Sequence, residues 1–264
     1  MVRSHGCPTP EVMALQHQQL VGPGALPALV AERGWSWSLC RLDRGDPLPP
    51  LRQPGQILVV LGGTMGVGDR DQPACPWMRD ELALIQARLE AGDPVLGLCL
   101  GAQMLVHVAG GTVEPLLQGH PPQALPEVGC GAVQWLPAAQ REPALAGFNA
   151  CEPVFFWHGD RCRLPPQATL LASSLACREQ VFRLGPAAWG IQFHAEITPA
   201  LARAWVEAVP EFVQRAHGAG GVSGLLKDLD SWGPLIQRRS QLLLGQVLDA
   251  LAARVDARPS LNAP

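Results

Sequence analysis

The 264-residue chain contains no tyrosine and only one lysine, Lys227. Tyrosine therefore cannot serve as an acid or base, and Schiff-base chemistry is excluded unless Lys227 carries it. The longest uninterrupted apolar run, Ile57 to Leu61, is far shorter than the roughly 20 residues that span a bilayer. Residues 1–6 also lack the apolar core of a secretory signal. These absences argue against a membrane or secreted protein and predict a cytoplasmic one.

Charge and hydropathy describe a folded protein without a basic surface. The formal net charge is −3, with 16% charged and 47% hydrophobic residues. Disordered chains carry more charge and fewer apolar residues, and nucleic-acid or anionic-membrane binding requires clustered basic charge. We therefore expect a globular protein that binds neither nucleic acid nor membranes.

The eight cysteines are scattered, and they form neither a CxxC pair nor the Cys/His spacing of a metal site. They are Cys7, Cys40, Cys75, Cys99, Cys130, Cys151, Cys162 and Cys177. Such spacing in a long chain does not indicate a disulfide scaffold. We expect free, buried thiols in a reducing compartment, with one exception discussed below.

Strand and helix signals alternate along the chain, which predicts an α/β fold with an open, mostly parallel twisted sheet and helices on both faces. Apolar runs predict strands at 12–15, 35–42, 56–61, 94–98, 154–157, 169–172 and 190–194. Amphipathic runs, several of which end at glycine or proline, predict helices at 25–33, 77–91, 100–109, 198–213 and 224–254.

Two stretches interrupt this alternation. Residues 112–150 are rich in proline, glycine and glutamine, and they predict loops and short edge strands. Residues 218–224 are glycine-rich and read as a linker, so we divide the chain into a main domain over 10–217 and a helical C-terminal extension over 218–264. Gly233-Pro234 predicts a break in the helix of the extension. The extension either packs on the main domain or forms the surface of a homodimer.

One short segment carries the strongest chemical signal. A buried strand ends in Gly97-x-Cys99-x-Gly101 and turns at once into a helix. This is the pattern of a nucleophile elbow, in which flanking glycines permit a tight turn that exposes the sulfur at the carboxyl edge of the sheet. The helix N-terminus favours a thiolate there, and the N–H of Leu100 can donate to an oxyanion. The competing interpretation is a buried cysteine between two packing glycines.

A thiolate nucleophile needs a base, and histidine is the usual one. His194 and Glu196 are two residues apart at a predicted strand end, so in an extended chain their side chains point to the same side. Glu196 can then bond one imidazole nitrogen while the other faces the sulfur. Taken alone, this histidine is more simply a satisfied structural residue at a strand end.

The two motifs together resemble the class I glutamine amidotransferases, which carry a Gly-x-Cys-x-Gly elbow and a downstream His-x-Glu. The likeness extends to stand-alone relatives of the GMP synthase glutaminase domain, and it covers residues 10–210. The matching segments, in order, are Leu61–Val67, Pro76-Trp77, Leu96–Gln103, Glu127–Gly129, Trp157–Asp160 and Gln192–Glu196. The resemblance implies a flavodoxin-like open sheet.

The resemblance also implies roles for individual residues. Cys99 would be the nucleophile on the side-chain amide of glutamine, with His194 as base and then acid, and Glu196 as its orienting partner. The backbone amides of Gly63 and Leu100 would form the oxyanion hole.

Further residues would bind the substrate. Gln103 would help to hold the glutamine, and the backbone of Trp157, His158 and Gly159 would contact its α-amino and carboxylate ends. The His158 side chain could equally be structural and tie strands together. The family often has proline where this chain has Thr64 and Ala195, and neither change removes a reactive group.

The implied reaction passes through a γ-glutamyl thioester and requires no metal or organic cofactor. The substrate would be glutamine or another γ-glutamyl compound. Because no synthetase segment follows, any enzyme that accepts the ammonia would be a separate chain. A self-sufficient γ-glutamyl peptidase or hydrolase is the second interpretation. The third is a non-catalytic regulatory binding module, which the presence of nucleophile, base and orienting carboxylate disfavours.

Overall fold

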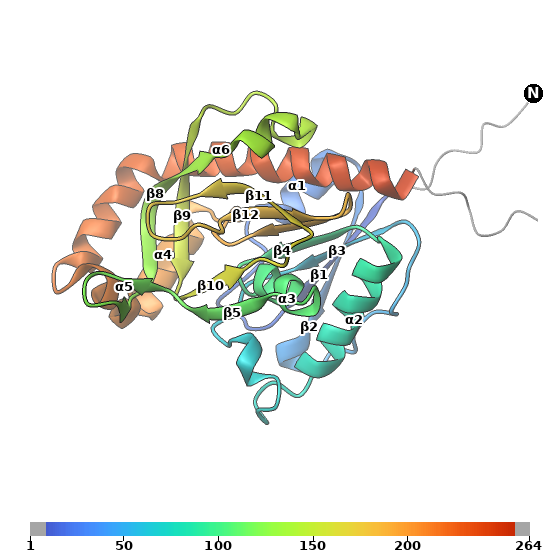
Figure 1. Ribbon diagram of the computed structural model, residues 1–264, viewed down its shortest axis with the longest axis horizontal. Helices are drawn as coiled ribbons and strands as arrows, with labels where there is room; N and C mark the ends of the chain where they lie inside the picture. The colour runs from blue at the N-terminus through green and yellow to red at the C-terminus, as the bar shows by residue number, and fades with distance from the viewer. Residues whose placement is uncertain (1–8, 257–264) are drawn as a thin grey trace, which may run out of the picture.

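The computed structural model describes residues 9–256, within which nine strands form one sheet in the order β2-β1-β3-β4-β13-β12-β11-β8-β9 (Figure 1). Their bounds are β1 Glu11–Gln16, β2 Ser36–Arg41, β3 Gln56–Val60, β4 Val95–Leu98, β8 Glu127–Trp135, β9 Cys151–His158, β11 Ala168–Ser173, β12 Val181–Leu184 and β13 Ala188–Ile191. Two small sheets pair β10 (Asp160–Arg163) with β5 (Thr112–Pro115) and β6 (Leu117–Gln118) with β7 (Gln123–Ala124).

The main sheet has a parallel half and an antiparallel half that meet at β13. Strands β2, β1, β3, β4 and β13 pair in parallel. From β13 onward, β12, β11, β8 and β9 continue the sheet with antiparallel pairing. The open α/β fold is therefore confirmed. The antiparallel strand β8 lies within residues 112–150, the stretch predicted as loops and short edge strands. The sequence does not indicate this strand because Gly129 and Gly131 interrupt its apolar pattern.

Helices cover both faces of the sheet, as predicted. Their bounds are α1 Leu26–Glu32, α2 Met78–Ala91, α3 Leu100–Val108, α4 Pro199–Ala208, α5 Pro210–His217 and α6 Gly221–Asp256, with 3₁₀ turns at η1 Leu42–Arg44, η2 Val67–Asp69, η3 Pro137–Arg141 and η4 Pro143–Leu145. Strand β3 lies between two hydrophobic cores, one on each face of the sheet. Ile57 and Val59 pack with α1 and α6, whereas Leu58 and Val60 pack with α2 and α3. Alternate residues of a strand point to opposite faces, so an unbroken apolar run serves both cores.

Proline has opposite effects at two positions in the C-terminal part. The predicted helix 198–213 is two helices, since Pro210 disfavours helical geometry at Val209, which adopts φ −135° and ψ 58°. The predicted break at Gly233-Pro234 is wrong, because α6 continues through Pro234. Leu229 and Ile236 on either side are buried, so tertiary packing holds the helix together there.

Helix α6 crosses the width of the molecule and contacts β8, β9, α1 and α4 (Figure 1). Its buried apolar side chains Leu243, Leu244, Val247, Leu248, Leu251 and Ala252 share one core with α1 and the strands. The division of the chain at residue 218 stays a prediction, as does the homodimer.

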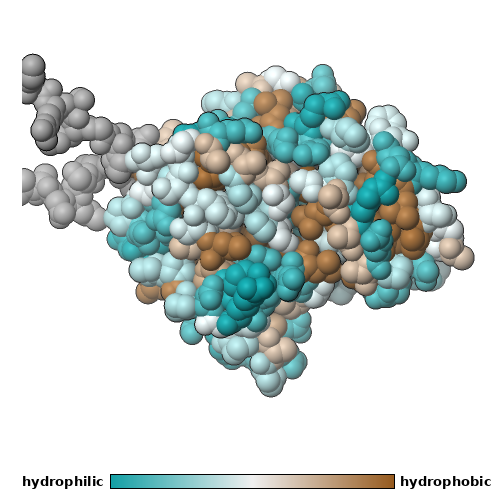
Figure 2. All heavy atoms as spheres, turned by 180° about the vertical axis from the view of Figure 1, so that it is seen from behind, coloured by the Kyte–Doolittle hydropathy of each residue, from teal (hydrophilic) through white to brown (hydrophobic). Residues whose placement is uncertain are grey.

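On the face shown in Figure 2, hydrophobic patches are separated by hydrophilic residues. The large apolar side chains that are exposed come from separate elements: Leu39, Leu51, Leu117, Leu175, Trp232 and Leu242. Among the described helices, none combines the length and the apolar character needed to cross a membrane. The described cysteines are all free, as expected. Five of them are buried, but Cys130 is half-buried and Cys151 is exposed, so the expectation of buried thiols is wrong at Cys151. Cys7 lies outside the described residues.

Two leucines of α6 test how much the helix contributes to stability. Leu248 is fully buried against the sheet, whereas Leu242 is 40% exposed on the same helix. We expect Leu248→Ala to lower the free energy of unfolding by about 2–5 kcal/mol, because it leaves a cavity in the core. Leu242→Ala should cost less than about 1 kcal/mol in the same urea titration. Equal losses for the two variants would contradict this packing.

Candidate active site

The backbone around Cys99 is a sharp turn between β4 and α3. Cys99 has φ 50° and ψ −103°, and among the described residues it is the one non-glycine with positive φ. A Cβ atom on Gly97 would lie 2.4 Å from the carbonyl carbon of Gly101, and one on Gly101 would lie 2.1 Å from the carbonyl oxygen of Val60. Glycine is therefore required at both positions, and the turn is the predicted elbow.

The elbow places Cys99 in the wall of a cavity of about 400 Å³ at the carboxyl edge of the parallel strands. The backbone N–H of Cys99 donates to Ile191 at the end of β13, at 2.8 Å, which fixes the turn against the neighbouring strand. Six of the predicted site residues join Cys99 around this cavity: Gly63, Gln103, Trp157, His158, Gly159 and His194. Segments far apart in the sequence thus meet at one place.

His194 and Glu196 lie on the turn that follows β13, three and five residues past its last residue, Ile191. The predicted strand 190–194 therefore ends too late, but the expected contact is present. Nδ1 of His194 lies 2.7 Å from Oε1 of Glu196, and both side chains are buried. The backbone fixes both residues, because the His194 N–H donates to Phe155 and the Ala25 N–H donates to Glu196.

The electrostatic setting of His194 favours its protonated form. Burial lowers the pKa of His194, but the charges of Glu196 and Cys99 and its hydrogen bonds to both side chains outweigh burial and raise the pKa to about 10. The ring also packs edge-on against Trp205, with centroids 4.6 Å apart. The arrangement can hold an imidazolium between a thiolate and a carboxylate.

The two candidate oxyanion donors flank Cys99. Leu100 is the first residue of α3, and the N–H groups of a first helical turn have no partner within the helix. Gly63 lies in the cavity wall, and its neighbour Gly62 approaches so closely that a Cβ there would lie 2.9 Å from the His194 ring. The loop that follows β3 can thus reach the thiol only because it has no side chains at these positions.

The predicted substrate-binding residues divide into two kinds. The Gln103 amide lies in the cavity wall and points to Gln192, at 3.4 Å. The His158 ring, by contrast, is fully buried, where it lies 3.1 Å from the Glu127 carboxylate and 2.9 Å from the Asp160 carbonyl. Its side chain therefore connects β9 to β8, which is the structural alternative noted from the sequence.

The outer wall of the cavity contains residues that the sequence did not single out. They come from helix α5, which contributes Glu211, Phe212 and Arg215. Phe212 packs against Trp157, with ring centroids 5.3 Å apart. Glu211 and Phe212 lie at the end of the predicted helix 198–213, and Arg215 lies just beyond it. No sequence pattern indicates that this part of the chain lies beside the cysteine.

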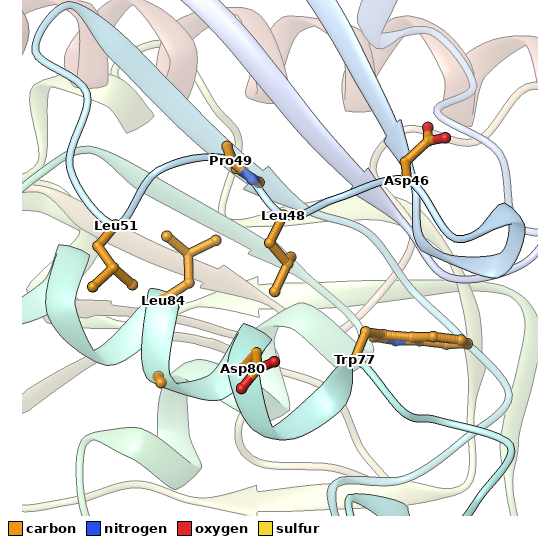
Figure 3. A pocket seen from close by; sticks show the side chains of 8 residues that line it. Asp46, Leu48, Pro49, Leu51, Trp77, Asp80 and Leu84 are labelled. Carbon is orange, nitrogen blue, oxygen red and sulfur yellow. The ribbon is translucent and has the colours of Figure 1, made fainter.

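A second cavity, of about 420 Å³, lies between the β2–β3 connection and α2 (Figure 3). Its labelled side chains are Asp46, Leu48, Pro49, Leu51, Trp77, Asp80 and Leu84. It shares no lining residue with the cavity at Cys99 and contains no cysteine or histidine among its lining residues.

The structure thus has a cysteine on a strand-to-helix elbow at the edge of an open α/β sheet, next to a buried His-x-Glu pair, which is the arrangement of a cysteine nucleophile with its base. The sequence profile of the family "Glutamine amidotransferase class-I" matches residues 48–207. The chain belongs to this family.

Relatives and solved structures agree with this assignment. The glutamine amidotransferase-like protein YfeJ of Salmonella typhimurium is 32% identical over 206 residues, covering 76% of this chain and 79% of YfeJ. One of the subunits of the glutamine-hydrolyzing GMP synthase of Methanoregula boonei is 35% identical over 42% of this chain, and the match spans 55% of that relative. A glutamine amidotransferase structure from Thermotoga maritima aligns with a TM-score of 0.77 at 27% identity, covering 92% of this chain and 98% of that one.

The raised pKa of His194 predicts a pH dependence of stability. A group whose pKa is about 10 in the folded state and 6.5 when unfolded stabilises the fold fully below pH 6.5, and this contribution is lost as the pH rises through 10. The difference in unfolding free energy between wild type and His194→Gln should therefore shrink between pH 6.5 and 10. Urea unfolding at a series of pH values measures it, and a constant difference would argue against the charged pair.

Proposed function

We propose that the chain hydrolyses the γ-amide of glutamine, or of another γ-glutamyl compound, through a thioester on Cys99. One observation carries the proposal. The His194 ring lies 2.7 Å from the Glu196 carboxylate and lines the same cavity wall as Cys99, whose elbow directs the sulfur into that cavity. This arrangement supports the roles of nucleophile, base and orienting carboxylate that such chemistry requires.

In the first half of the reaction, the Cys99 thiolate attacks the γ-carbonyl carbon and the carbonyl π electrons move to oxygen. The N–H groups of Gly63 and Leu100 are proposed to donate to this oxyanion. When the tetrahedral intermediate collapses, the C–N bond breaks and the His194 imidazolium gives its proton to the departing nitrogen. Ammonia or an amine leaves, and a γ-glutamyl thioester remains.

In the second half, neutral His194 removes a proton from water, which attacks the thioester carbon. A second oxyanion forms and collapses, the C–S bond breaks and the thiolate is regenerated. The γ-carboxylic acid that is released loses its proton to solvent and leaves as the carboxylate. Glu196 accepts the hydrogen bond from Nδ1 throughout, so it fixes the ring tautomer and stabilises the imidazolium. It transfers no proton itself.

Substrate binding is assigned to groups in the cavity wall. Gln103 is proposed to bind the glutamine through its side-chain amide, and the backbone of Trp157, His158 and Gly159 is proposed to bind the α-amino and carboxylate groups. The aromatic faces of Trp157 and Phe212 would exclude water from the acyl-enzyme.

The fate of the nitrogen separates two versions of this function. In the first, ammonia passes to a synthetase on a separate chain, as the GMP synthase relative suggests. In the second, the chain is a self-sufficient γ-glutamyl peptidase. The outer wall favours the second version, since Arg215 on α5 provides a positive charge that can pair with the carboxylate of a residue beyond the γ-glutamyl group.

Nucleophile replacement tests the proposed chemistry. Cys99→Ala should reduce turnover by a factor on the order of 10⁴ or more and abolish the acyl-thioester mass in intact-protein mass spectrometry. Its fold should persist, because alanine fills no more space at the elbow. His194→Ala should lose more activity than Glu196→Gln, since only His194 transfers protons. An adduct that forms at another cysteine would contradict the assignment.

A partner-free assay separates the two versions. Purified protein is incubated with glutamine and with γ-glutamyl dipeptides, and release of ammonia or of the second residue is followed. We expect the dipeptides to turn over with the higher kcat/KM, and Arg215→Ala to reduce that value by roughly tenfold, as expected for one lost charged contact. Lys227→Ala, which changes a charge on α6, is the matched control. Turnover that appears only when a synthetase is added would favour the ammonia-delivery version.

A further inference from the structure

A buried histidine–carboxylate pair lies behind the loop that carries Gly63. His17 directly follows β1 and Glu81 lies in α2, and both side chains have no exposed surface. The two ring nitrogens of His17 have different partners. Nδ1 lies 2.9 Å from the carbonyl oxygen of Gly62, and Nε2 lies 2.8 Å from Oε1 of Glu81. Neither residue lines the cavity at Cys99.

The partner of Nδ1 fixes where one hydrogen must be. A carbonyl oxygen can only accept a hydrogen bond, so Nδ1 carries a hydrogen and donates it to Gly62. Burial lowers the pKa of His17, but the charge and hydrogen bond of Glu81 and the bond to Gly62 together raise it above its ordinary value. A ring that is protonated on both nitrogens donates to both partners at once.

Because the peptide group is planar, the hydrogen bond from His17 to the Gly62 carbonyl also sets the direction of the Gly63 N–H. The carbonyl of Gly62 and the N–H of Gly63 belong to one planar trans peptide, so they point in opposite directions. When His17 holds the carbonyl oxygen on the buried side, the Gly63 N–H is directed away from His17, toward the cavity that Gly63 lines. We propose that His17, supported by Glu81, is a positioning residue that keeps the Gly62–Gly63 peptide in its oxyanion-binding orientation.

The loop needs such an anchor because of its own sequence. A Cβ atom on Gly62 would lie 2.9 Å from the His194 ring, and one on Gly63 would displace the ends of the Met65 and Leu100 side chains. Two consecutive glycines leave the peptide between them free to rotate, and rotation would replace the N–H donor by a carbonyl oxygen. On the far side of the loop, the Thr64 hydroxyl donates to Gln18 at 2.7 Å. The residues that follow β1 therefore fix both ends of the turn.

The consequence for catalysis rests on the proposed function of Cys99. An oxyanion donor acts on the transition state, and loss of one such donor costs roughly 10²–10³ in kcat. Partial misorientation of the Gly63 N–H should cost about 10- to 100-fold in kcat with little change in KM. Simple alkylation of the thiolate forms no oxyanion, so it should not depend on His17.

Two amide replacements separate the contacts of His17. The amide nitrogen of asparagine is as many bonds from Cα as Nδ1, and that of glutamine is as many bonds from Cα as Nε2. Asparagine can therefore retain the bond to Gly62, while glutamine retains only the bond to position 81. Both are made together with Glu81→Gln, so that neither variant leaves a buried carboxylate without its imidazole. Glu81→Gln alone is the reference, in which a neutral His17 still donates to Gly62.

Kinetics and chemical labelling of Cys99 are then compared. In the Glu81→Gln background, His17→Gln should lower the rate of acylation by a γ-glutamyl substrate 10- to 100-fold, and His17→Asn should restore it to within about threefold of the reference. The rate of alkylation of Cys99 by iodoacetamide, followed by peptide mass spectrometry, should be the same in all three proteins. Parallel loss of acylation and alkylation in His17→Gln would reduce His17 to a general structural role and overturn the proposal.

Crystal structures of the same variants show the orientation of the Gly62–Gly63 peptide directly, without an activity measurement. The Gly62–Gly63 peptide should keep its orientation in His17→Asn and rotate or adopt two orientations in His17→Gln. An unchanged peptide in His17→Gln would overturn the anchor, even if wild-type Cys99 proved unreactive toward γ-glutamyl substrates. Absence of the wild-type acyl-enzyme, with the peptide rotated as expected, would instead refute the proposed function and leave the anchor established.

Discussion

The structure depends on the close approach of helix α3 to strands β3 and β4. Gly97 and Gly101 have no side chains to keep these elements apart. A Cβ atom at either position would lie 2.1–2.4 Å from the backbone of the neighbouring element, far below van der Waals contact. The chain can then turn within one residue, and Cys99 takes the positive φ that this turn demands. Strain of this kind persists only where the surroundings enforce it, and here the buried sheet does so.

The parallel and antiparallel halves of the sheet contribute different residues to the site around this turn. The parallel half provides Cys99 from β4 and the glycine loop from β3, and both lie at its carboxyl edge. The antiparallel half provides Trp157 at the end of β9 and buries the His158–Glu127 pair behind it. Strand β13 is the border between the halves, and the turn after it carries His194 and Glu196.

Two buried imidazoles then serve different parts of the same site. His194 lies next to a thiol and a carboxylate, and both raise its pKa. His17 lies between a peptide carbonyl and a carboxylate, so its hydrogen bond orients the backbone. Both rings have their charge compensated by an adjacent glutamate, which is how a low-dielectric interior can retain a cation.

The sequence by itself determined the α/β class, most strands of the parallel half and the elbow, because apolar periodicity and glycine spacing are local properties of the chain. It also indicated the cysteine and the His-x-Glu pair, since these motifs lie directly after buried strands. Only the tertiary structure brought Phe212 and Arg215 over the cysteine, made β8 part of the main sheet and paired His17 with Glu81. Those contacts join residues far apart in the chain, and their geometry is set by how helices and strands pack, for which a single sequence carries no local signal.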